Sequence, residues 1–195
     1  MIRLICFHSN TQPYQNMAAR CVETFGQFGM GVTAFEFEST GDWMKNALYR
    51  APELLKIALA SPADVVGMLD ADVYAIKDPV RIREFESDFG VEDRGHSYPK
   101  NRRYSAGVVL FGPTELGRAL LKNWAGLCGY DPLPEEPLRE QRYLHDSVVL
   151  LQKRGLKVDN LGNSYNCKPE RVNAETVIVH EVASRETLGS LGGKR

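Results

Sequence analysis

Apolar positions follow two alternating spacings along the first part of the chain. Residues 2–7, 32–37 and 65–70 are apolar or alternating runs of strand length, and the third is apolar enough for a strand buried on both faces. Between them, residues 15–28 and 43–60 repeat apolar side chains at helical spacing. The pattern predicts strand, helix, strand, helix, strand. This order is typical of an α/β fold with parallel strands and right-handed crossovers.

In the rest of the chain, charged and proline-rich stretches interrupt the apolar pattern. Pro52 is expected either to split the helix at 43–60 or to begin its second piece. Residues 84–103 are charged and irregular. The further elements expected are a strand at 104–111, a helix at 113–127, a proline-rich loop at 129–140, a helix beginning at His145, and short strands at 156–161 and 176–179. Asp146 or Ser147 is a candidate cap for the first turn of the helix at His145.

Composition indicates one compact domain. The chain has 195 residues, of which 43% are apolar, and no shift in composition divides it. A formal net charge of -1 provides neither an overall basic surface for nucleic acid nor a polybasic tract for a membrane. We expect a domain over residues 1–188 and a flexible glycine-rich tail over residues 189–195.

The expected location is the cytoplasm. The apolar start is too short for a signal peptide, and no run approaches the length of a membrane helix, so stable membrane insertion is not expected. The four cysteines are scattered without a Cys-x-x-Cys pair, which indicates neither a zinc knuckle nor a disulfide framework. Cys6 and Cys21 fit buried core thiols.

Asp70 and Asp72 are the strongest candidates for chemistry. They end the third apolar run at a spacing of two residues, so in an extended segment their carboxylates share one side. A hard divalent cation such as Mg²⁺ or Mn²⁺ would relieve their repulsion and still hold the phosphates of a substrate. The end of a parallel strand is also where open α/β sheets bind ligands. Alternatively, one of the two aspartates only caps a turn before Pro79.

Small residues lead into the strand at 104–111. Ser105, Ala106 and Gly107 would let backbone and ligand approach closely, although a tight turn into a buried strand explains them equally well. The preceding stretch, 94–103, interleaves cations and aromatic residues. It fits a loop over a site, and it fits a solvated loop better than a nucleic-acid contact.

Five motifs in this order resemble the GT-A type of nucleotide-diphospho-sugar transferase, with the pattern of glycosyltransferase family 8 and its retaining relatives. They are the Asp-x-Asp signature at 69–73, the small-residue strand at 104–111, the acidic helix start at 145–151, the Asn-containing segment at 163–169 and the final strand at 177–180. The resemblance covers nearly the whole chain.

The resemblance implies a single-domain, Rossmann-like α/β fold with a mixed, mostly parallel sheet flanked by helices. It implies hexosyl transfer, with retention, from a nucleotide diphosphate donor, expected to be UDP-linked. Mn²⁺ or Mg²⁺ would be held by Asp70, Asp72 and His180. Asp146 would stabilise the reacting sugar or contact the acceptor. The acceptor, a saccharide, a protein or less readily a nucleic acid, and the oligomeric state stay open.

The resemblance also implies a set of donor contacts. The loop from Ser9 to Tyr14 is similar to one that holds uracil, which makes Tyr14 the candidate for base stacking. Arg50 and Lys56 are candidates for the sugar or diphosphate, although solvated helix charges explain them equally. The full set is His8, Ser9, Tyr14, Arg50, Lys56, Ala71, Ser105, Ala106, Gly107, Asn166 and Arg185.

One departure concerns the segment after His180. Family members follow the metal-binding His with a Gly and a Lys-Pro-Trp, whereas this chain continues Glu-Val-Ala-Ser-Arg185. Arg185 or Lys194 is the candidate substitute cation. The alternatives left open are a nucleotide-sugar hydrolase and a non-catalytic nucleotide- or sugar-binding module. A nucleotidyltransferase is disfavoured because the loop at 8–15 contains neither Gly nor Lys.

Overall fold

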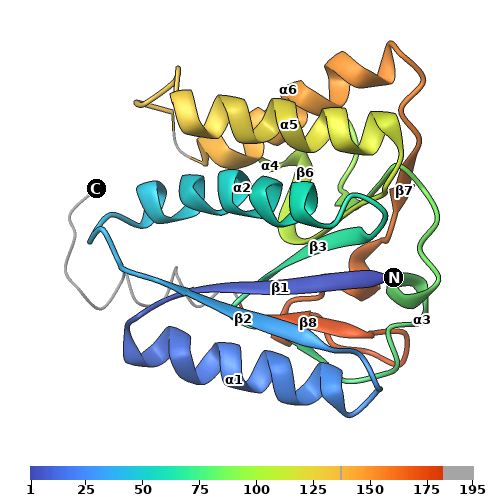
Figure 1. Ribbon diagram of the computed structural model, residues 1–195. Helices are drawn as coiled ribbons and strands as arrows, with labels where there is room; N and C mark the ends of the chain where they lie inside the picture. Colours follow the sequence, from blue (N-terminus) through green and yellow to red (C-terminus); the bar gives the residue numbers. More distant parts are fainter. Residues whose placement is uncertain (137, 182–195) are drawn as a thin grey trace.

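The protein is a central sheet with helices on both faces (Figure 1). The computed structural model describes residues 1–136 and 138–181. Helix α1 covers one face of the sheet, and α2, α5 and α6 cover the other. The strands are β1 (Ile2–Ser9), β2 (Val32–Phe37), β3 (Val65–Asp70), β4 (Val73–Ala75), β5 (Phe89–Asp93), β6 (Tyr104–Phe111), β7 (Val158–Asn160) and β8 (Ile178–His180). The α-helices are α1 (Gln12–Gly26), α2 (Trp43–Ala60), α3 (Val80–Arg83), α4 (Lys100–Arg103), α5 (Glu115–Tyr130) and α6 (Arg139–Gln152).

The sheet is mixed but mostly parallel, as the sequence predicts. Its six strands have the order β2-β1-β3-β6-β5-β7, and β1 pairs in parallel with both β2 and β3. Strand β6 runs antiparallel to β3 and to β5, and β7 is parallel to β5. A separate two-stranded sheet joins β4 to β8 in antiparallel pairing. Because β4 directly follows β3, this small sheet lies beside the carboxyl end of β3.

Helix α2 is continuous, so the expected break at Pro52 is wrong. Asp42 caps its start by accepting hydrogen bonds from the backbone amides of Met44 and Lys45. The proline removes one helical hydrogen bond. Burial of one face of the helix against the sheet and α5 offsets that loss, through Leu48, Ala51, Leu54 and Ala58.

Helix α6 begins at Arg139, six residues before the expected start at His145. Leu138, in the left-handed region at φ 54°, leads into it. Asp146 and Ser147 therefore lie inside the helix, and the interpretation of either as its cap is wrong. The charged side chains of the first turn hid this start, because they look like loop residues although they are buried.

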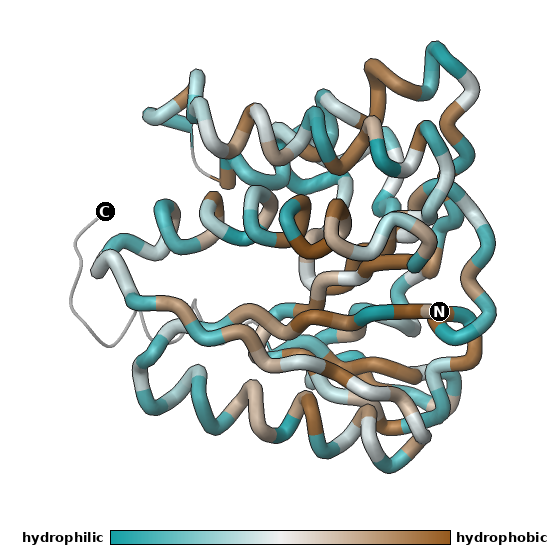
Figure 2. Tube along the Cα trace, in the orientation of Figure 1, coloured by the Kyte–Doolittle hydropathy of each residue, from teal (hydrophilic) through white to brown (hydrophobic). Residues whose placement is uncertain are grey.

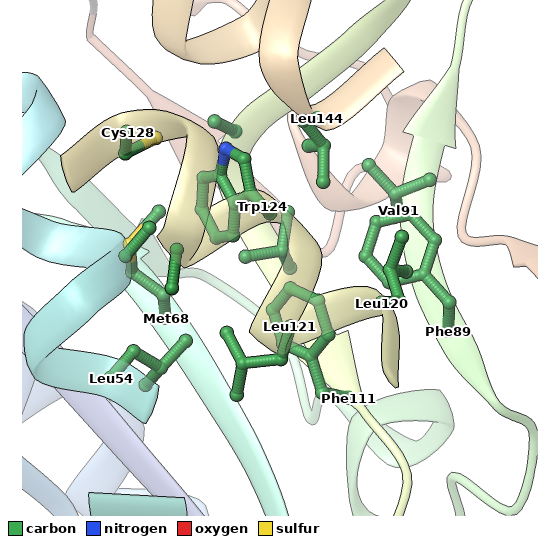
Figure 3. Close-up of a cluster of buried hydrophobic side chains, with 14 of the residues drawn as sticks. Leu54, Met68, Phe89, Val91, Phe111, Leu120, Leu121, Trp124, Cys128 and Leu144 are labelled. Carbon is green, nitrogen blue, oxygen red and sulfur yellow. The ribbon is translucent and has the colours of Figure 1, made fainter. Parts of the chain in front are cut away.

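Two apolar clusters fill the layers on either side of the sheet. Figure 2 shows that many of the most apolar residues lie along the central strands. The larger cluster lies between the sheet and helices α2, α5 and α6, where Trp124 stacks on Phe111 with ring centroids 5.7 Å apart (Figure 3). The smaller one lies under α1 and contains Cys6 and Cys21, which confirms both as buried core thiols. Among the described helices, none combines the length and hydrophobicity that a bilayer crossing requires.

Candidate metal centre

Three residues from distant parts of the chain converge where β3 ends. Asp70 is the last residue of β3, and Asp72 follows after one residue. The pairing of β4 with β8 sets Val73 opposite His180, which brings the imidazole back to the two aspartates. One ligand atom from each of these three side chains lies within 4.8 Å of the others. The structure thus brings together the three residues that the sequence suggests as metal ligands.

The side chain of His180 is held from behind. Its Nδ1 lies 2.8 Å from Asn166 Oδ1, while its Nε2 lies 3.2 Å from Asp72 Oδ1 and 3.4 Å from Asp70 Oδ2. Burial lowers the pKa of His180, but the hydrogen bond to Asp72 and the charges of both aspartates outweigh burial and leave the pKa above its ordinary value. These distances show that the Nε2 of the imidazole faces the two carboxylates.

Gly107 makes this arrangement possible. A Cβ at this position would lie 2.5 Å from His180 Nδ1 and 2.7 Å from Asn166 Oδ1, which is closer than real contacts allow. Only glycine therefore lets β6 pass so close to the imidazole and the amide. Its neighbours Ser105 and Ala106 are buried with it.

The donor set fits a divalent cation. Two carboxylates and one imidazole nitrogen face a common point, and the ring nitrogen remote from that point is hydrogen-bonded to the protein. A hydrogen bond on the far nitrogen is the usual companion of a metal-binding histidine. Carboxylate-rich sets of this kind suit Mn²⁺ or Mg²⁺.

Asp70 is held by a buried ionic chain. Arg50 Nη1 donates to Asp70 Oδ1, and Arg50 Nη2 donates to both carboxylate oxygens of Glu140, at 2.9 and 2.8 Å. Burial opposes the charge of Arg50, yet Asp70 and Glu140 raise its pKa above the ordinary value. Burial raises the pKa of Glu140, although Arg50 favours its charged form. Arg50 is thus a bridge between two buried carboxylates rather than a solvated helix charge.

Glu140 is a site residue that the sequence reasoning missed. It lies in the first turn of α6 and is 5% exposed. The resemblance called for an acidic helix start facing the reacting centre and assigned it to Asp146. In the structure the first turn of α6 lies six residues earlier, and its acidic residue is Glu140. Placing the start of α6 correctly would have found it.

A cleft of about 400 Å³ is lined in part by the three candidate metal ligands. This volume is within the range of small-molecule binding pockets. Its walls come from the ends of β1 and β2, the starts of α1, α2 and α6, the turn after β3, and His180 of β8. Aromatic rings of Phe7, Tyr14, Phe37 and Trp43 form much of the apolar wall. The residues expected from the sequence that line the cleft are His8, Ser9, Tyr14, Arg50, Asp70, Ala71, Asp72 and His180.

Other expected residues lie elsewhere. Lys56 is 70% exposed, pairs with Glu53 at 2.6 Å, and is not among the described residues that line the cleft. Asp146 is also not among the described residues that line the cleft. It accepts a hydrogen bond from Arg142 Nε at 2.8 Å. Ser105, Ala106, Gly107 and Asn166 are buried behind the candidate metal ligands rather than on the walls. Arg185, Lys194 and the tail 189–195 lie outside the described residues.

The comparisons with known proteins support the fold and leave the family open. No protein-family model matches the sequence. No curated protein matches it. Among the matching solved structures is the crystal structure of a glycosyltransferase involved in the glycosylation of the major capsid of PBCV-1. The match has a TM-score of 0.63 and 15% identity, and it covers 97% of this chain and 98% of that chain. At this identity the likeness establishes a glycosyltransferase fold and not a substrate.

Proposed function

We propose that this protein is a metal-dependent glycosyltransferase that uses a nucleotide diphosphate sugar, with uridine as the expected base. The observation that carries the proposal is the convergence of Asp70, Asp72 and His180 at the edge of the cleft, in a fold shared with a glycosyltransferase. The expectation of uridine is supported by Tyr14, which lies on the cleft wall in the first turn of α1, within the segment that resembles a uracil-holding loop.

The three residues would hold Mn²⁺ or Mg²⁺. Bound there, the cation would act as a Lewis acid that stabilises the negative charge gained by a departing diphosphate. The chain supplies the rest of the positioning. Arg50 fixes the orientation of the Asp70 carboxylate, and the buried Asn166 fixes the imidazole of His180.

Glu140 is the carboxylate that we assign to the sugar. Transfer passes through oxocarbenium-like character at the sugar carbon, which a nearby carboxylate stabilises. The carboxylates on the described cleft walls are those of Asp70, Asp72 and Glu140, and the first two belong to the metal set. Glu140 therefore replaces Asp146 in this role. Retention of configuration is proposed on the resemblance to retaining families alone.

Turnover of nucleotide sugars tests the proposal. The protein is incubated with a panel of nucleotide sugars, with and without Mn²⁺, and release of nucleoside diphosphate is measured with and without candidate saccharide acceptors. We expect metal-dependent release that an acceptor accelerates, and its loss in Asp72→Asn. Equal release without any acceptor would favour a hydrolase. Metal-dependent binding without release would favour a binding module, and no response to any nucleotide would overturn the proposal.

A further inference from the structure

A chain of buried polar groups runs from β5 to the imidazole of His180. Asn166 Nδ2 donates to Glu92 Oε2 at 2.5 Å and to Ser105 Oγ at 2.7 Å, while Asn166 Oδ1 lies 2.8 Å from His180 Nδ1. Glu92, Ser105 and Asn166 are each less than 10% exposed. The metal residues are therefore backed by a second carboxylate that does not line the cleft.

The acceptor oxygen of Glu92 decides which way the Asn166 amide points. A carboxylate is only an acceptor, so it must face the amide NH₂ rather than the amide oxygen. The reverse orientation would set two oxygens 2.5 Å apart. Arg94 Nε donates to the same Glu92 oxygen at 3.1 Å, so Oε2 acts as an acceptor toward both neighbours. The Asn166 oxygen is thereby directed at His180.

The amide orientation in turn decides where the imidazole carries its proton. Asn166 Oδ1 is an acceptor, so a neutral His180 donates to it from Nδ1 and has its lone pair on Nε2. That lone pair faces the carboxylates of Asp70 and Asp72. In the opposite tautomer, Nε2–H would donate to Asp72 and occupy the direction that a cation needs.

The backbone is shaped around this chain of groups. The pairing of β5 with β6 shifts register between Val91 and Glu92, which brings Glu92 opposite Ser105. Irregularities of this kind re-aim side chains and are common next to active sites. Both side chains then reach the same Asn166 amide, and Gly107 leaves room for the link to His180.

We infer that Glu92 is a positioning residue: through the Asn166 amide it holds the His180 proton on Nδ1 and so keeps Nε2 available to a metal. The inference rests on the proposed metal function. It adds a residue that neither touches the cation nor lines the cleft.

The tautomer of His180 tests the inference once the competing carboxylates are removed, because in metal-free protein Asp70 and Asp72 themselves attract a proton to Nε2. Long-range ¹H–¹⁵N spectra of histidine-labelled, metal-free Asp70→Ala/Asp72→Ala protein are recorded in alkaline buffer, where the imidazole is neutral, and His180 is assigned with His180→Gln. We expect the Nδ1–H tautomer in this background. A His180 with its proton on Nε2 there would overturn the inference.

Variants then connect the tautomer to the metal. Glu92→Leu removes the acceptor. It should populate Nε2–H in the Asp70→Ala/Asp72→Ala background and, with both aspartates present, weaken Mn²⁺ binding about 10- to 100-fold. Glu92→Gln keeps the shape but no longer dictates the amide orientation, so its effects should be intermediate. The matched control is Asp88→Leu, which removes a buried carboxylate just before β5 that bonds to Thr114 and to the Lys157 amide, away from His180.

Asp88→Leu should lower stability without changing the tautomer or the Mn²⁺ affinity. If Glu92→Leu or Glu92→Gln behaves in the same way, Glu92 is merely structural and the inference fails. If the wild type binds no Mn²⁺ at all, the proposed function fails instead, and the tautomer of His180 still decides the role of Glu92.

Discussion

The three candidate metal ligands, Asp70, Asp72 and His180, are supported by two arms that differ in kind. An ionic arm runs from Glu140 through Arg50 to Asp70, and an amide arm runs from Glu92 through Asn166 to His180. Each arm starts at a buried carboxylate and has one side chain between it and a candidate ligand. In the ionic arm the middle group carries a permanent positive charge, while in the amide arm it is neutral and has one donor end and one acceptor end.

The difference determines what each arm can do. A guanidinium donates to both neighbours, so it orients Asp70 and offsets the charge of two carboxylates at once. An amide passes the direction of hydrogen bonding from one neighbour to the next, so it can select a histidine tautomer. The ionic arm should therefore matter more for stability, because an unpaired buried charge costs more than an unpaired neutral group.

The largest expected effect on stability comes from breaking the ionic arm. Arg50→Met leaves Asp70 and Glu140 facing each other without a cation, so it should lower the free energy of unfolding by about 3–5 kcal/mol. Urea denaturation measures the change. Arg154→Met is the control, because its 3.5 Å pair with Glu115 is exposed and should be worth about 0–1 kcal/mol. Equal losses in the two variants would show that the ionic arm does not stabilise the site.

A smaller loss of stability is expected when a larger side chain pushes the amide arm apart. Gly107→Ala places a methyl group against His180 and Asn166, and such overpacking should cost about 1–3 kcal/mol. It should also weaken Mn²⁺ binding by displacing the imidazole. The control is Gly126→Ala in α5, where a Cβ meets nothing within 4 Å. That variant should be stabilised by roughly 0.5–1 kcal/mol, since alanine favours helix. A neutral Gly107→Ala would contradict the close packing described for His180.

Much of the first half of the fold was predictable from the sequence. Strands β1, β2 and β3 and helices α1 and α2 each follow a local apolar pattern, and the three strands are neighbours in the sheet. The antiparallel direction of β6 and the β4–β8 pair depend on contacts between residues far apart in sequence. Nothing in the sequence around Arg50 indicates that it pairs with Asp70 and Glu140. Glu140 and Glu92 are buried only because a specific partner satisfies each carboxylate, which a hydrophobic pattern does not record.

A pH effect is expected at Asp93, the residue that follows Glu92 on β5. Burial opposes its ionisation, yet hydrogen bonds from Arg103 lower the pKa of Asp93 below its ordinary value. The ion pair therefore contributes stability above the unfolded pKa of about 3.9, and this stability is lost as pH falls through the lower folded pKa. Asp93→Asn should flatten the acid limb of the curve of stability against pH. An unchanged acid limb in the variant would show that the pair contributes nothing there.

The smallest effect is expected at Asp146, which belongs to neither arm. Its pair with Arg142 is separated by one helical turn and is partly exposed, so Asp146→Asn should cost about 0.3–0.5 kcal/mol. Turnover of nucleotide sugar should be nearly unchanged in this variant and clearly reduced in Glu140→Gln. The opposite ranking of the two variants would return the catalytic role to Asp146.

The most direct test of the account is a Mn²⁺ titration followed by electron paramagnetic resonance, on the wild type and on Asp72→Asn. Each arm holds a candidate ligand of the same cation. We predict one saturable site in the wild type that the variant loses. Binding that is the same in both proteins, or no binding in the wild type, would contradict it.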